Sequence, residues 1–172
     1  MNASEARRKS AIAVSVFAIF FAGIASYSVS DWRTALPLAI FYLALLINTY
    51  FSVKLFSQII PKSDTLQNVT DAVLVLFYFG LPLALETPLL FYFLSSVFFI
   101  CSCMKYVFLL GTIAQPKLLK RKILLNLLGA LGCLVTFGTA VAGYQSVSWI
   151  FASAFCIGHV IVLFVRPMYR LD

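Results

Sequence analysis

The sequence has few charged residues for its length. Asp, Glu, Lys and Arg make up 11% of the 172 residues, whereas about 25% is usual in soluble domains. Hydrophobic residues make up 62%, against roughly 45–50% in soluble domains. A water-soluble fold of this size needs charge on its surface, so the composition excludes one. We predict an integral membrane protein whose apolar surface is in contact with the lipid bilayer.

The sequence also lacks the residue groups that metal and cofactor sites need. His159 is the only histidine, which excludes a bis-histidine haem site and any metal centre built from several histidines. No two of the four cysteines form a C-x-x-C pair, and each is expected to act as a small hydrophobic residue. These cysteines are Cys101, Cys103, Cys133 and Cys156. We therefore predict no metal, no cofactor and no catalytic residue.

The net charge of +7 does not indicate nucleic-acid binding. The basic residues form short clusters between apolar stretches, and no basic face interleaved with aromatic residues is present. Such clusters are typical of topology signals in membrane proteins.

Six apolar stretches predict an all-α bundle of six transmembrane helices in a single membrane domain, residues 1–172. About 20 mostly apolar residues cross a hydrocarbon core of about 30 Å. The stretches are 11–28, 35–60, 72–85, 89–113, 123–142 and 147–165. The connections between them are short, so neighbouring helices are expected to run antiparallel.

The cations predict the orientation, because loops rich in Lys and Arg stay in the cytoplasm. With six helices, most cations fall on one side: Arg7, Arg8, Lys9, Lys62, Lys117, Lys120, Arg121, Lys122, Arg166 and Arg170. The other side has Arg33 beside Asp31 and Glu86. We predict that both termini are cytoplasmic, in a bacterial-type cytoplasmic membrane. Anionic lipids are expected to contact the loop cations Lys117, Lys120, Arg121 and Lys122.

An alternative concerns the first helix alone. Residues 7–25 also resemble a secretory signal, with a small-residue cleavage site at Gly23-Ile24-Ala25. Its apolar run is longer than that of most signals, which favours a retained helix. Cleavage would leave the orientation of the other helices unchanged.

Small residues predict where the helices pack closely, since close approach replaces the hydrophobic effect in lipid. Residues 123–142 and 147–165 are rich in Gly and Ala, so we expect them to form a close hairpin. Ala18, Ala22 and Ser26 predict a buried face on the first helix. A homo-oligomer contact or another membrane-protein partner is the alternative use of such stripes. The segments 35–60 and 89–113 carry large side chains and are expected to face lipid.

Polar groups at depth are costly in lipid, so each is a candidate ligand-binding residue. They are Asn48, Lys54, Asp71, Lys105, Asn126 and His159. All fall in the cytoplasmic half of the predicted bundle, which predicts a polar pocket open to the cytoplasm. Each also has a structural interpretation. The lysines can extend to the lipid headgroups, Asp71 can cap a helix or pair with Lys54, and His159 can form an interhelical hydrogen bond.

Gly80 and Pro82 predict a kink in the short third helix. Proline removes one backbone hydrogen bond and leaves the carbonyl one turn earlier without its donor. Interrupted helices of this kind occur at the substrate sites of transporters.

These patterns favour a protein that binds or conducts a small molecule, or a helper subunit of a membrane complex. A structural or immunity-type protein that acts through protein contacts is an alternative. A membrane-embedded lipid-modifying enzyme is less favoured, because no nucleophile, base and orienting group are visible together.

Overall fold

The computed structural model describes residues 3–59, 65–111, 115–144, 146–165 and 168. Within these residues the chain is all-helical, without strands, and contains six long helices in the predicted order. Their bounds are α1 Ala3–Ser28, α2 Trp32–Ile59, α3 Thr65–Leu83, α4 Pro88–Leu109, α5 Pro116–Val141 and α6 Val147–Val160. A short π-helix, η1 (Ile161–Val165), continues α6. In this part of the chain, α1 to α5 and the combined segment of α6 and η1 are each long and apolar enough to cross a membrane.

Three helices begin seven or eight residues earlier than the apolar stretches predict. α1 begins at Ala3 rather than at residue 11, α3 at Thr65 rather than at 72, and α5 at Pro116 rather than at 123. The added turns of α1 and α5 are rich in Ala, Lys, Arg and Leu, which favour helix, and proline is well suited to the first helical position of α5. α3 therefore has 19 residues, and the prediction of a short third helix was wrong.

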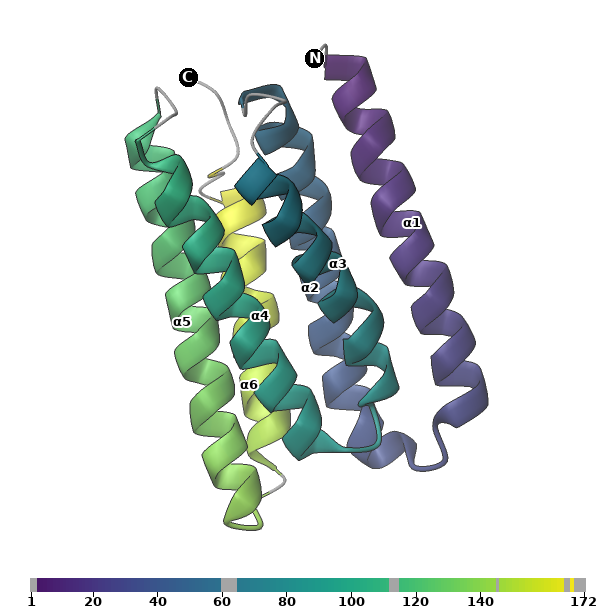
Figure 1. Cartoon of the computed structure of the whole chain (residues 1–172). Coiled ribbons are helices and arrows are strands. Elements are labelled where there is room, and N and C mark those ends of the chain that lie inside the picture. The colour runs from purple at the N-terminus through teal and green to yellow at the C-terminus, as the bar shows by residue number, and fades with distance from the viewer. Residues whose placement is uncertain (1–2, 60–64, 112–114, 145, 166–167, 169–172) are drawn as a thin grey trace.

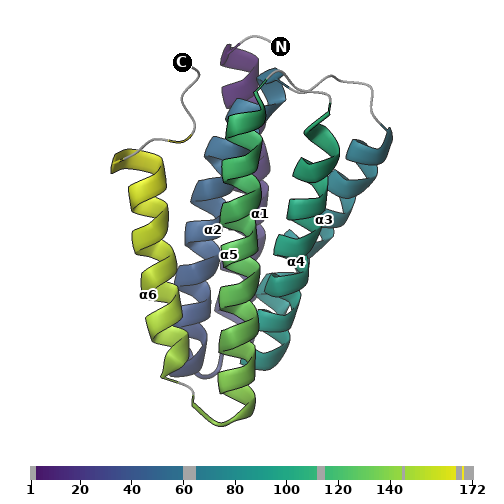
Figure 2. The same ribbon diagram turned by 90° about the vertical axis from the view of Figure 1, so that its left-hand side faces the viewer.

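Consecutive helices run antiparallel (Figure 1). α1 packs against α2 and α3 at one edge of the bundle, and α5 packs against α4 at the other edge. α6 packs against α2 and α5 (Figure 2). We name the end where α1, α3 and α5 begin the basic end, after its exposed cations Arg7, Arg8, Lys9, Lys117, Lys120 and Arg121. Lys62, Arg166 and Arg170 lie outside the described residues.

Aromatic rings fill the centre of the bundle. Phe41 and Tyr42 of α2 are fully buried, as are Phe91 and Tyr92 of α4. The Phe41 ring centroid lies 4.2 Å from that of Phe155 in α6. The prediction that α2 and α4 are the likelier helices to face lipid on much of their surface was therefore wrong, since they are the two most buried of the six spans in the described residues. Large rings bury more area than small residues and so form the interhelical core here.

The predicted close α5–α6 hairpin is present only in part: Gly132 of α5 lies against the Phe151 ring of α6, which an added Cβ would overlap. α5 packs most extensively on α4, where Gly129 admits the Phe99 ring at 2.9 Å from the position of an added Cβ. α6 contacts α2 more extensively than it contacts α5. Its Ala154 is exposed, and an added Cβ at Gly158 would have no neighbour within 4 Å. The aromatic rings of α6 pack on Phe41, and Ala152 is buried, whereas Ala154 stays uncovered.

On α1 the buried face also differs from the predicted one. Phe17, Phe21 and Ala25 are buried. Of the predicted residues, Ala18 is partly buried and packs against the core, whereas Ala22 and Ser26 are exposed. The Phe17 ring stacks on Tyr78 of α3 at a centroid distance of 4.6 Å. Packing of large rings again decides which face is covered. A homo-oligomer contact through the exposed stripe stays a prediction.

Two exposed carboxylates order the connections at the opposite end of the bundle. Asp31 precedes α2 and accepts hydrogen bonds from the Thr34 hydroxyl at 2.6 Å and the Arg33 amide at 3.0 Å. This is a helix N-cap, and the Thr34 hydroxyl is the main cause that lowers the pKa of Asp31. Glu86 accepts the Ser30 hydroxyl at 2.6 Å, which likewise lowers the pKa of Glu86. The second contact ties the α1–α2 connection to the α3–α4 connection.

Candidate functional site

A cavity of about 390 Å³ lies between α1, α2, α3, α4 and α5 in the half of the bundle nearest the basic end. We call it the polar cavity, after the polar side chains of its lining. They include Asn48, Ser52, Asp71, Lys105, Lys122 and Asn126. Four of the six predicted site residues therefore meet at one cavity. Rings and aliphatic side chains such as Phe17, Leu45 and Phe98 line its remainder.

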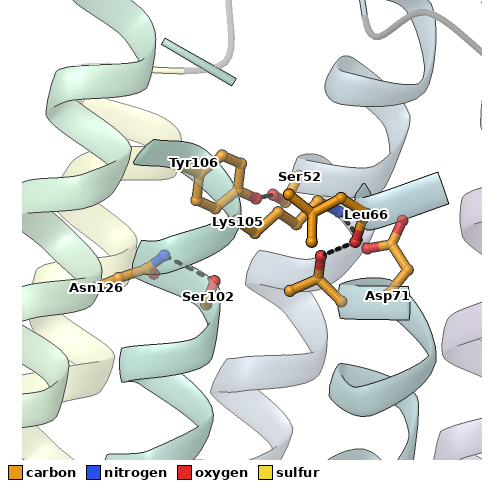
Figure 3. Close-up of polar contacts among 8 residues, drawn as sticks. Ser52, Leu66, Asp71, Ser102, Lys105, Tyr106 and Asn126 are labelled. Atoms are coloured by element: carbon orange, nitrogen blue, oxygen red, sulfur yellow. Dashed lines mark hydrogen bonds and ion pairs between the residues drawn. The ribbon is translucent and has the colours of Figure 1, made fainter. Parts of the chain in front are cut away.

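An ion pair joins α3 to α4 in the polar cavity. The Lys105 ammonium contacts the Asp71 carboxylate (Figure 3). The Lys105 side chain is 13% exposed and that of Asp71 is 46% exposed, so Asp71 lies at the rim. The predicted pairing of Asp71 with Lys54 was wrong, because α3 begins earlier and places Asp71 beyond its first turn.

A second lysine, Lys122, enters the cavity from α5. Lys122 is 3% exposed, and its Nζ lies 3.4 Å from Oδ1 of Asn48. The ammonium groups of Lys122 and Lys105 lie 5.9 and 6.0 Å from the centroid of the Tyr106 ring. The prediction that Lys122 is a surface cation in contact with anionic lipids was therefore wrong, because its side chain is buried. Lys122 and Asn126 are four residues apart and therefore share one face of α5.

Hydroxyl and amide groups complete the polar lining. The Asn126 amide donates to Oγ of Ser102 at 2.7 Å, and the hydroxyls of Ser52 and Tyr106 lie 3.0 Å apart (Figure 3). Each of these bonds joins α4 to another helix, so the cavity wall is fixed by contacts between helices. Sequence reasoning missed the serines, because hydroxyls are common in membrane helices and give no separate signal.

A second cavity, of about 270 Å³, lies between α5 and α6. We call it the α5–α6 groove, after its apolar lining Leu125, Leu128, Gly129, Phe151, Ala154, Phe155, Gly158 and Val162. It shares Asn48, Phe99, Lys122 and Asn126 with the polar cavity. His159 lines the groove rather than the polar cavity. Its Nδ1 lies 2.8 Å from the Phe155 carbonyl, which can only accept, so a neutral ring has Nδ1 protonated and Nε2 as an acceptor.

The remaining predicted residues lie away from both cavities. Lys54 is partly buried on α2 and lines neither cavity. Pro82 lies in the last turn of α3, and its missing N–H would have bonded to the Tyr78 carbonyl. That carbonyl instead accepts the Tyr42 hydroxyl at 2.7 Å. The helix is continuous through Gly80 to Leu83, and a kink at Gly80 and Pro82 stays a prediction.

The lining is suited to binding by charge and hydrogen bonds. It offers three lysine ammonium groups, one carboxylate, four side-chain amides and several hydroxyls around one volume. Among the residues that the structure describes, no three of His, Cys, Asp and Glu are grouped so that they could hold a metal ion.

Comparison of the chain with models of protein families, with curated proteins and with solved structures gives no match.

Proposed function

We propose that the chain crosses a membrane six times, with its basic end in the cytoplasm, as in a bacterial-type cytoplasmic membrane. The six long apolar helices support membrane insertion. The exposed cations at the basic end support the orientation, because Lys and Arg concentrate on the cytoplasmic side. At the opposite end Arg33 is accompanied by Asp31 and Glu86. Lys117, Lys120 and Arg121 are placed to contact anionic lipids of the cytoplasmic leaflet.

We further propose that the polar cavity binds a small polar molecule that enters from the cytoplasm. The observation that supports this most is the meeting of Asp71, Lys105 and Lys122 from three helices around one volume. A charged residue in a membrane helix costs about 2.5–3.5 kcal/mol even by insertion scales. A purely structural bundle would gain stability by replacing such groups with apolar ones. Small-molecule sites have volumes of roughly 300–1,000 Å³, and the polar cavity lies within this range.

Two serines on α4 provide a matched test of this proposal. Ser95 and Ser102 are both buried, and seven residues apart they lie on one face of the helix. Ser102 lines the polar cavity, whereas Ser95 lines none of the cavities described above. Each is replaced by cysteine in a variant that lacks the four native cysteines. A small charged methanethiosulfonate reagent is then added to membrane vesicles of known sidedness.

We expect S102C to react at least about ten times faster than S95C when the reagent has access to the cytoplasmic side, because thiol reactivity follows water access. From the other side neither variant should react. Equal rates at the two positions would show that no water-filled cavity reaches Ser102. Faster reaction from the outside would reverse the proposed orientation.

A further inference from the structure

The polar cavity and the α5–α6 groove meet at one shared wall. Asn48 of α2, Phe99 of α4, and Lys122 and Asn126 of α5 line both. The two volumes are therefore adjacent, with Lys122 at their junction. The ammonium of Lys122 lies close to Asn48 on this wall. A molecule that contacts Lys122 can extend into either volume.

The two volumes differ in chemistry. The described lining of the polar cavity contains three lysines, Lys9, Lys105 and Lys122, and one carboxylate, Asp71. Lys105 pairs with Asp71 and Lys9 with Glu5, and Lys122 adds a further positive charge, which favours an anion. The α5–α6 groove is apolar apart from the shared wall and His159. It reaches the outer surface of the bundle, because Leu128 is 56% exposed and Ala154 is also exposed.

Particular residues of α6 leave the groove open. α6 packs on α2 through Phe151 and Phe155, whose rings lie 5.5 and 4.2 Å from that of Phe41. Gly158, one turn from Ala154, has open space where a Cβ would be. Small side chains facing an uncovered volume give room for an alkyl chain beside α6.

We propose that the site binds an amphiphile with an anionic head and one apolar chain. The head occupies the polar cavity beside Lys122 and Lys105, and the chain lies in the α5–α6 groove. A fatty-acid carboxylate and an anionic lipid headgroup offer the same chemistry to Lys122. This inference rests on the proposed binding function and specifies its ligand class. The exposed end of the groove gives the chain a route from the bilayer.

Photolabelling of the purified full-length protein tests this inference. The probe is decanoate with a diazirine at the end of its chain, and labelled residues are mapped by peptide mass spectrometry. We expect label on groove residues such as Leu128 and Ala154. Unlabelled decanoate should compete with the probe, whereas decyltrimethylammonium of equal chain length should not. Competition by both compounds to the same extent would overturn the anionic head.

Two variants and a control locate the chain and the head. Gly158→Leu fills the groove, and Lys122→Gln removes the cation at the junction. Each should lower labelling of the groove at least about tenfold, since a charge-assisted contact or a buried chain is worth that factor. Gly138→Leu on α5 is the control, because an added side chain there meets open space and Gly138 does not line the groove. Its labelling should equal that of the wild type.

The outcomes separate this inference from the function on which it rests. Label spread evenly over lipid-facing residues such as Ile12 and Ile19 of α1, in the wild type, would overturn the amphiphile, and this result needs no variant to fold. If S102C is water-accessible and butyrate slows its modification, the polar cavity still binds small anions. If S102C does not react, the proposed function itself fails. The decanoate and butyrate arms also distinguish a lipid-like ligand from a free small anion.

Discussion

The Tyr42 hydroxyl provides a quantitative test of how a buried backbone carbonyl obtains its hydrogen bond. It donates to the Tyr78 carbonyl at 2.7 Å, the acceptor that Pro82 leaves without a backbone donor. An ordinary interhelical hydrogen bond in a membrane protein contributes about 0.6 kcal/mol, with a maximum near 1.7. A buried acceptor left unsatisfied costs about 1–3 kcal/mol. Tyr42→Phe should therefore lower the free energy of unfolding by about 1–2 kcal/mol.

A second substitution separates the lost bond from other effects of removing the hydroxyl. Pro82→Ala restores an N–H that can donate to the Tyr78 carbonyl. In that background Tyr42→Phe should cost about 0.5 kcal/mol, which gives a coupling energy near 1 kcal/mol in a double-mutant cycle. Equilibrium unfolding in mixed micelles of a mild detergent and dodecyl sulfate gives the four free energies. The wild type, the two single variants and the double variant are all measured in micelles of the same composition.

Tyr92→Phe is the matched control for this cycle. Tyr92 is fully buried, and its hydroxyl makes no hydrogen bond of ordinary geometry among the described residues, although Ser148 lies near it. Removing the hydroxyl should leave stability nearly unchanged, because no well-formed bond is lost. The reasoning would be refuted if Tyr42→Phe cost the same in both proline backgrounds, or if it cost no more than Tyr92→Phe.

Two further predictions concern packing and pH. Gly132→Ala should destabilise the protein by about 1–3 kcal/mol, because a Cβ there overlaps the Phe151 ring. At Gly138 an added Cβ meets open space, so Gly138→Ala should be neutral or stabilising. If the two substitutions changed the free energy of unfolding equally in the same assay, the close contact of Gly132 with Phe151 would be contradicted. The hydrogen bond from Ser30 lowers the folded-state pKa of Glu86 below its ordinary value of 4.5. The stabilisation that this hydrogen bond gives is present above pH 4.5 and is lost as the pH falls through the folded-state pKa. Glu86→Gln should therefore flatten the acid side of a plot of melting temperature against pH. An unchanged plot would argue against the contact between Glu86 and Ser30.

The number and order of helices could be predicted because apolar runs of this length rarely occur outside membrane-spanning helices. The helix starts could not, because hydropathy does not distinguish a polar helical turn from a loop. Thr65 and Pro116 begin helices whose first turns contain polar or charged side chains. Helix propensity would have favoured the earlier start at Pro116, which is followed by Lys, Leu and Arg, but not the one at Thr65, which is followed mainly by Asn, Val, Thr and Asp.

The buried faces could not be predicted from hydrophobicity either. Lipid and protein core are equally apolar, so a hydropathy scale does not distinguish Phe41 in the core from Leu43 on the surface. The expectation that small residues mark the interfaces is met at Gly129 and fails at Ala22. Which large ring enters which gap depends on the arrangement of all six helices.

The polar cavity was partly predictable from the cost of polar groups in lipid. Asn48, Asp71, Lys105 and Asn126 line it together, as the shared half of the bundle suggested. Lys122 was not predicted to line the cavity, because it follows a run of surface cations in the sequence. Its spacing of four residues from Asn126 was the signal that could have found it.

The proposed function depends most on the chain crossing the membrane with its basic end in the cytoplasm. Single cysteines at two exposed sites test it most directly: Tyr144→Cys at the opposite end and Lys117→Cys at the basic end. A membrane-impermeant maleimide is applied to intact cells and then to permeabilised ones. Position 144 should be labelled in intact cells, and position 117 only after permeabilisation. Labelling of position 117 in intact cells, or equal labelling of both before permeabilisation, would contradict the account.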